Sequence, residues 1–129
     1  MTTIYVDQGA ILDTPRASGP DEGSLRSLGF LREAGHDVVL VLDPRLDVVA
    51  QTFLGDWATI ELERVPLRPE EPAWYLTAEV DRCRGRSPLL RTVLIGASPA
   101  GAAIHRCDTL ARDIPAAVLE ILAAEAMRP

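Results

Sequence analysis

The stretch TIYVDQGAILD, residues 3–13, decides the fold expected for this chain. Its apolar run, residues 4–6, has the length and composition of a buried strand. Gly9 follows, and glycine accepts backbone conformations that other residues resist, so the chain can leave the sheet there through a tight turn. Ile11 and Leu12 then supply apolar side chains that pack back beneath the strand. We therefore expect a buried strand followed at once by a tight turn.

Strand-like and helix-like segments alternate along the rest of the sequence. This alternation is typical of a mostly parallel sheet with helices on both faces, which predicts a three-layer α/β/α sandwich of five to six strands. Segments 59–63 and 106–110 are expected at the sheet edges. Further strands are predicted over residues 37–42, 74–77 and 92–96, and helices over residues 21–34 (capped by Asp21 or Ser24), 44–53, 79–86 and from Ile114 onward, the last capped by Asp113.

Composition favours one soluble domain spanning residues 1–129. No apolar run approaches the roughly 18 residues that a membrane span requires, and no basic-then-apolar leader opens the chain, so we expect a cytoplasmic protein. The formal net charge of −6 argues against nucleic acid as a partner. Arg82, Arg84 and Arg86 form the nearest approach to a basic patch, and their spacing predicts a solvated surface instead.

The cysteines and histidines do not form a metal-binding pattern. Cys83 and Cys107 are not part of a Cys-x-x-Cys pair, and His36 and His105 lie far apart in the sequence, so no zinc site is expected. In a cytoplasmic protein, buried or half-buried free thiols are the default expectation for such cysteines.

Residues 3–13 resemble the first motif of the haloacid dehalogenase (HAD) superfamily, in which a strand ends in Asp-x-Asp-Gly-Thr. The passage GSLRSLGFLREAGHDVVLVLD and the later LLRTVLIG and CDTLARDIPAAVLEIL are also similar to HAD segments, and the order of elements matches from end to end. The resemblance implies a HAD-like Rossmannoid fold. Neither usual position of a cap domain holds an insertion of domain size, so a capless member is expected.

The first motif lacks the carboxylates that HAD phosphatases use. Aligned without a gap, the nucleophilic Asp falls on Val6 and the acid/base Asp on Gln8, and neither side chain can do that chemistry. An alignment shifted by one residue places Asp7 at the nucleophile, but Gly9 then replaces the acid/base. Neither alignment restores both carboxylates.

The second and third motifs are also altered. The hydroxyl that holds a phosphoryl oxygen at the end of the second strand is replaced by Leu42, which is followed by Asp43. The lysine of the third motif best matches Arg68, which keeps the charge but changes its reach and geometry.

The fourth motif normally supplies carboxylates that bind magnesium. Its first Asp falls on Ala78 and its last on Arg82, which leaves Asp7, Glu79 and Asp81 as weak candidate ligands. Magnesium requires hard oxygen ligands in a near-octahedral array, so the resemblance implies that this cofactor is absent unless the alternative activity below holds.

These replacements favour a non-catalytic HAD-like protein, a pseudophosphatase that acts as a binding, regulatory or assembly module without a cofactor. Its partner is expected to be a protein or a second copy of the chain. The aromatic residues are possible contacts with that partner, although core or edge packing is the more ordinary role for Tyr5 and Tyr75. Trp57 is expected in a loop. Trp74 follows the link that ends at Pro72 and is expected to cover the sheet edge.

Two other functions remain open. The first is a divergent, weak magnesium-dependent phosphatase with Asp7 as nucleophile and Asp43, Arg68 and Asp81 as helpers; capping of helices and exposure to water are the ordinary roles of such acids. The second is a purely structural subunit that associates through the small apolar side chains of its last helix.

Overall fold

The computed structural model describes residues 2–11, 22–42, 57–66, 68–83, 88–96 and 107–127. The strands are β1 (Thr3–Asp7), β2 (Asp37–Leu42), β3 (Ala58–Glu61), β4 (Ala73–Thr77), β5 (Leu90–Ile95) and β6 (Thr109–Ala111). The α-helices are α1 (Glu22–Glu33) and α4 (Ile114–Ala126), and the short 3₁₀ helices are η1 (Gln8–Ala10), η2 (Leu62–Arg64) and η3 (Val80–Arg82).

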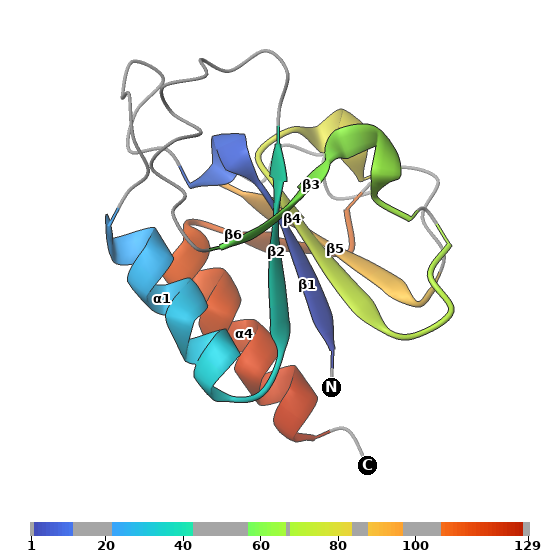
Figure 1. Ribbon diagram of the computed structural model, residues 1–129. Helices are drawn as coiled ribbons and strands as arrows, with labels where there is room; N and C mark the ends of the chain where they lie inside the picture. The colour runs from blue at the N-terminus through green and yellow to red at the C-terminus, as the bar shows by residue number, and fades with distance from the viewer. Residues whose placement is uncertain are drawn as a thin grey trace.

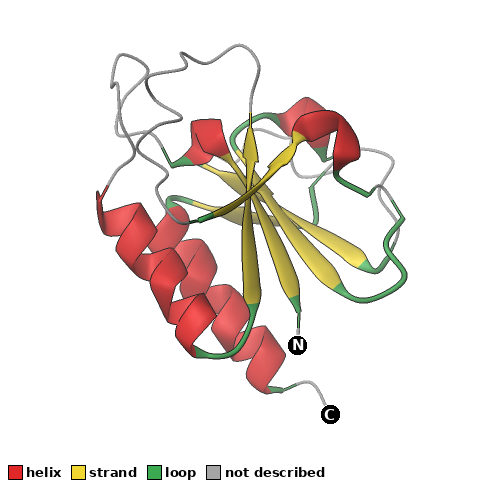
Figure 2. Ribbon diagram, viewed as in Figure 1, coloured by secondary structure: helices red, strands yellow, loops and turns green. Residues whose placement is uncertain are grey.

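The strands form one six-stranded sheet in the order β3-β2-β1-β4-β5-β6, and every neighbouring pair is parallel (Figures 1 and 2). The predicted α/β class and parallel sheet are therefore confirmed. The strands at the two edges are β3 and β6, as the sequence predicts, although β3 ends at Glu61 and continues into η2, and β6 begins three residues later than predicted, at Thr109. β1 and β4 lie side by side in the centre.

The main core lies between the sheet and the two α-helices. Figure 1 shows α1 and α4 side by side against one face of the sheet. The apolar side chains that alternate along the central strands, including Ile4, Val6 and Leu40, point toward this face and meet Leu28 and Leu31 of α1. Period-two alternation in strands and a helical stripe therefore combine in one core.

The opposite face of the sheet has a smaller apolar cluster. Val41, Tyr75 and Leu90 form its centre together with Val65, which lies just after η2, and Tyr5 packs against it. The helix predicted over residues 44–53 and the possible cap Asp21 lie outside the described residues. Among the described segments, none forms a cap domain.

The structure corrects the expectation that Trp74 covers a sheet edge. Trp74 is fully buried because β5 and β6 extend the sheet beyond β4, which makes β4 a central strand. Its indole Nε1 donates a hydrogen bond to Glu125 Oε1 at 2.8 Å, and the Arg91 guanidinium lies 4.3 Å from the ring centroid. The expected packing role of Tyr75, by contrast, is confirmed, since this side chain is also fully buried.

A second correction concerns the cysteines, which are not free thiols. Cys83, directly after η3, forms a disulfide with Cys107, which lies just before β6. Both residues are buried beside Leu94 of β5, with Leu110 packed against them. The sequence separation of 24 residues gave no sign of this pairing; the parallel sheet creates it by placing the end of η3 next to the approach to β6.

Residue Asp113 caps α4 as predicted. Its Oδ1 accepts a hydrogen bond from the Ala116 backbone N–H at 2.8 Å, which satisfies one of the unpaired donors at the start of the helix. The predicted helix over residues 79–86 corresponds, where it is described, to the single 3₁₀ turn η3. None of the described helices is long and apolar enough to cross a membrane.

The cap gives a testable prediction. Asp113→Ala is expected to lower the free energy of unfolding by about 1 kcal/mol, since alanine cannot accept the Ala116 N–H bond. Urea unfolding monitored by circular dichroism measures the change. Asp113→Asn is the matched control because asparagine caps helices as well as aspartate does. Equal stabilities of the alanine and asparagine variants would show that the cap does not contribute.

Candidate functional site

The carboxyl ends of the parallel strands meet at one edge of the sheet, which is where ligands bind in open α/β folds. Asp7 is the last residue of β1, Leu42 ends β2, and Thr77 ends β4 on the other side of β1. The central strands therefore bring one carboxylate and one hydroxyl to the same place.

Asp7 is the centre of this site, and its carboxylate is held from several directions. Its Oδ1 accepts a hydrogen bond from the Tyr75 hydroxyl at 2.7 Å, and its Oδ2 accepts one from the Thr77 hydroxyl at 2.5 Å. The Arg82 Nη1 donates to the same Oδ2 at 2.7 Å, forming an ion pair. Because Asp7 is only 2% exposed, these partners replace the water that would otherwise solvate the charge.

Arg82 reaches Asp7 from η3, and its side chain is 15% exposed. Its Nη2 also pairs with Glu79 Oε2 at 2.9 Å, so the guanidinium lies between two carboxylates. The start of this segment is fixed in turn, since the Glu79 backbone N–H donates to the Thr77 hydroxyl at 3.0 Å. The expectation of a solvated surface is therefore wrong for Arg82; Arg84 and Arg86 lie outside the described residues.

The two first-motif positions of the ungapped alignment, Val6 and Gln8, are both buried. Val6 is fully buried on the opposite side of β1, in the core beneath α1 and α4, because successive residues of a strand point to opposite faces. Gln8 lies in η1 and is 1% exposed. The strand-end carboxylate thus belongs to Asp7, which is the geometry of the alignment shifted by one residue.

Leu42 and Ala78, the altered positions of the second and fourth motifs, differ in exposure. Leu42 is half-buried and packs against the main core. Ala78 directly follows β4 and is exposed. Neither side chain can bind a metal or donate to a phosphoryl oxygen.

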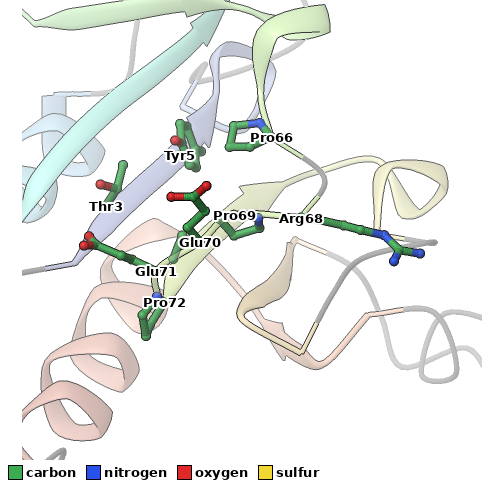
Figure 3. A pocket seen from close by; sticks show the side chains of 9 residues that line it. Thr3, Tyr5, Pro66, Arg68, Pro69, Glu70, Glu71 and Pro72 are labelled. Atoms are coloured by element: carbon green, nitrogen blue, oxygen red, sulfur yellow. The ribbon is translucent and has the colours of Figure 1, made fainter.

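Arg68 lies at the other end of the strands. It belongs to a pocket of about 390 Å³ that also contains Thr3 and Tyr5 of β1 and Ala73, the first residue of β4. Thr3 and Asp7 are at opposite ends of β1, roughly 13 Å apart at the rise of an extended strand. Arg68 is exposed, and its side chain points away from Tyr5 in Figure 3. The structure therefore does not bring Arg68 to Asp7.

The same pocket contains acidic side chains and a half-buried phenol. Figure 3 shows Glu70 and Glu71 on the side of Tyr5 and Thr3, with Pro66, Pro69 and Pro72 along the rest of the wall. Burial raises the pKa of the Tyr5 phenol, so its hydroxyl stays protonated at neutral pH.

The remaining candidate ligands do not assemble a metal centre. Glu79 is paired with Arg82, Asp81 is exposed, and Asp43 lies outside the described residues. In the described part of the chain, no group of three or more histidine, cysteine or carboxylate side chains could hold a metal ion.

Sequence reasoning missed the roles of Tyr75 and Thr77. The alternation of β4 could have revealed them, because residues 75 and 77 share one strand face, and Tyr75 pairs in register with Tyr5 two positions before Asp7. No local pattern could have assigned Arg82 to Asp7, since the contact depends on the path of the chain after β4.

Two solved structures are similar to this fold over nearly the whole chain. One is a D,D-heptose 1,7-bisphosphate phosphatase from Burkholderia thailandensis, with a TM-score of 0.63 and 14% identity, covering 95% of this chain and 99% of that one. The other is the phosphatase of the same name from B. bronchiseptica in complex with magnesium and phosphate, with a TM-score of 0.64 and 12% identity, covering 96% and 99%.

The chain has a HAD-like fold. At these identities the likeness establishes the HAD-like architecture and not the activity. Neither a protein-family model nor a curated protein matches the sequence.

Proposed function

We propose that this chain is a non-catalytic HAD-like protein, a pseudophosphatase that acts as a binding, regulatory or assembly module. The observation that supports it most directly is the occupied state of Asp7, whose two carboxylate oxygens accept hydrogen bonds from Tyr75, Thr77 and Arg82. A carboxylate nucleophile needs an oxygen lone pair directed at the substrate. In this structure, side chains of the protein donate hydrogen bonds to both Asp7 oxygens.

Arg82 also reverses the electrostatics that phosphoryl transfer requires. When residues 77–82 are aligned with the fourth HAD motif, Arg82 stands at the position of the motif's last carboxylate. A side chain that would bind a cation is thus replaced by one that is itself a permanent cation, since the guanidinium does not deprotonate in proteins. The positive charge next to Asp7 is supplied by the chain, and a magnesium ion at Oδ2 would have to displace it.

Neither alignment of the first motif supplies the carboxylate that acts as general acid/base in HAD phosphatases. Gln8 is an amide and, in the shifted alignment, Gly9 has no side chain at the acid/base position. A leaving alkoxide would therefore receive no proton from either residue, and general acid catalysis commonly contributes a factor of about 10² to 10⁴ in rate.

A non-catalytic protein of this kind would act through its surface. β3 is an edge strand with mostly exposed residues, and an edge presents unpaired backbone groups to another chain. Phe30 of α1 and Leu119 of α4 add exposed apolar side chains. These features support a protein partner or a second copy of the chain.

The proposed cytoplasmic location has a consequence for the disulfide. A cytoplasmic location stays a prediction, and disulfides are rare in cytosolic proteins because thiol systems reduce them. A cytoplasmic protein with the Cys83–Cys107 pair would hold it as a bond that forms and breaks.

The alternative remains a divergent magnesium-dependent phosphatase with Asp7 as nucleophile. The observation that favours it is the position of Asp7 at the carboxyl end of the central strand β1, beside Thr77. This activity would require Arg82 to leave Oδ2 before substrate and metal could bind.

Thermal unfolding with magnesium and beryllium fluoride, which together mimic an aspartyl phosphate complex, separates the two functions. We expect the melting temperature to change by less than about 1 °C, because the Arg82 guanidinium already pairs with Asp7 Oδ2. A site filled at a hundredfold above its Kd would instead add about 2.7 kcal/mol and raise the melting temperature by several degrees. A rise that needs both additives and disappears in Asp7→Asn would support the phosphatase and contradict the proposal.

A further inference from the structure

The segment that carries Arg82 has little structure of its own. η3 is a single 3₁₀ turn, and its described backbone bond runs from the Arg82 N–H to the Glu79 carbonyl at 3.1 Å. Isolated turns of this length are not stable without outside contacts, because one hydrogen bond does not offset the ordering of several residues. Besides the Arg82 ion pairs, contacts at the two ends of η3 therefore hold this turn in place.

The N-terminal end of η3 is attached to β4 through Thr77, whose hydroxyl accepts the Glu79 backbone N–H. The C-terminal end is attached by a covalent bond, because Cys83 is the residue directly after Arg82. Arg82 is thus the direct sequence neighbour of a disulfide-bonded residue.

The other half of the disulfide is fixed to the sheet. Cys107 is followed by Asp108, whose Oδ2 accepts hydrogen bonds from the Thr92 backbone N–H at 2.7 Å and from the Thr92 hydroxyl at 3.1 Å. The Asp108 backbone N–H donates back to the Thr92 hydroxyl at 3.0 Å. Cys107 is therefore held against β5. Because the disulfide joins Cys107 to Cys83, it also restrains the backbone position of the adjacent Arg82.

The disulfide lies apart from the main core. Its sulfur-bearing residues form a separate buried cluster with Leu94, on which Leu110 packs, whereas the main core lies beneath α1 and α4. Loss of the bond would release η3 without removing any side chain of the main core. A disulfide that acts as a switch must be able to break while the fold stays intact, and this separation from the main core meets that requirement. A disulfide that only stabilises the fold has no such requirement.

From this geometry we infer that the Cys83–Cys107 disulfide is a redox lock that keeps Arg82 over Asp7, and that its reduction opens the strand-end crevice. A dithiol reductant supplies the electrons: one of its thiolates attacks a cysteine sulfur, the S–S bond breaks, and its second thiol closes the reductant's own disulfide. The two cysteines take up two protons and two electrons and become thiols. Arg82 is then free to leave, and Asp7 becomes accessible to solvent and to ligands.

Carboxyl labelling with a water-soluble carbodiimide and glycinamide, read by peptide mass spectrometry, tests this lock on the whole chain. In the oxidised protein we expect little labelling of Asp7, which is 2% exposed. After treatment with dithiothreitol, labelling of Asp7 is expected to become at least tenfold faster. Asp37, which is exposed on β2, is the internal control and is expected to be labelled at the same rate in both states.

Two variants sharpen the test. Cys83→Ala combined with Cys107→Ala is expected to label at Asp7 at the fast rate with or without the dithiol. Arg82→Ala is expected to label at the fast rate even with the disulfide intact. Should the double variant fail to fold, dithiol treatment of the folded natural sequence still decides the matter.

Either of two results would overturn the lock. Slow labelling of Asp7 in the reduced protein would mean that Arg82 stays in place without the bond. A simultaneous red shift of tryptophan emission, measured in a Trp57→Phe background so that only the buried Trp74 reports, would mean that reduction unfolds the main core, so that the bond is a staple. The inference rests on the proposal that Arg82 covers a non-catalytic Asp7, but its readout is independent, since the magnesium and beryllium fluoride experiment does not require a change of redox state.

Discussion

Replacing Asp7 with alanine is expected to lower the free energy of unfolding by about 3–5 kcal/mol. The change removes one of the two carboxylates that pair with a guanidinium only 15% exposed, and removing one member of a buried ion pair costs more than the pair itself contributes. It also leaves the Tyr75 and Thr77 hydroxyls without their common acceptor. Denaturation in urea, followed by circular dichroism, measures the loss against the natural sequence.

A matched variant distinguishes this effect from a general loss of negative charge. Asp37→Ala removes a carboxylate of the same type from an exposed position on the neighbouring strand β2, and its effect is expected to stay within about 0.5 kcal/mol. If Asp7→Ala were as stable as Asp37→Ala, the Asp7 cluster would not be a structural ion pair, and the main support for the non-catalytic proposal would be lost.

The second large effect is expected at Trp74. Trp74→Ala removes a fully buried indole from the central strand, which costs about 3–5 kcal/mol through lost burial and the cavity that remains. It also removes the donor to Glu125 Oε1, although Thr2 Oγ1 still donates to Glu125 Oε2 at 3.0 Å. The melting temperature and the urea midpoint are expected to fall together.

One comparison variant isolates the hydrogen bond from the burial of Trp74, and a second serves as a control for the loss of an aromatic side chain. Trp74→Phe keeps most of the apolar volume but leaves Glu125 Oε1 without the indole donor, so a loss of about 1–3 kcal/mol is expected. Phe30→Ala, at a half-exposed aromatic on α1, is expected to change stability by less than about 0.5 kcal/mol. A phenylalanine variant as stable as the natural sequence would show that the bond to Glu125 contributes nothing.

The sequence predicted the fold better than the site, and the reason is physical. The strands and the closing helix carry patterns that are local, such as the apolar run of residues 92–96 and the cap at Asp113. Strand ends shifted by a few residues, as at β3 and β6, because the last residues of a strand are set by pairing with a neighbour.

The site depends on contacts that no local pattern carries. The alternative assignment of Asp7 to the strand end could be made from the first motif, but its partners come from β4 and from η3. The sequence predicts a solvated Arg82 because the spacing of Arg82, Arg84 and Arg86 scatters their side chains around a helix. The structure instead uses its charge to compensate a buried carboxylate.

The cysteine error has a different origin. Free thiols are the default for a cytoplasmic protein, so the prediction for Cys83 and Cys107 depends on the predicted compartment and not on a pattern in the residues. The Cα atoms are 5.0 Å apart only after the sheet has formed, so the pairing was not visible in the sequence.

The strand order also affects how fast this chain can fold. β1 pairs with β2, which follows after one helix, but its other neighbour is β4, so that Tyr5 must find Tyr75 across more than half of the chain. The entropy of closing so long a loop is lost before the pairing returns any stability, and parallel sheets with such distant contacts fold slowly. During synthesis, the inner edge of β1 therefore remains unpaired until β4 has emerged, and this interval is when the nascent chain is most exposed to misassociation.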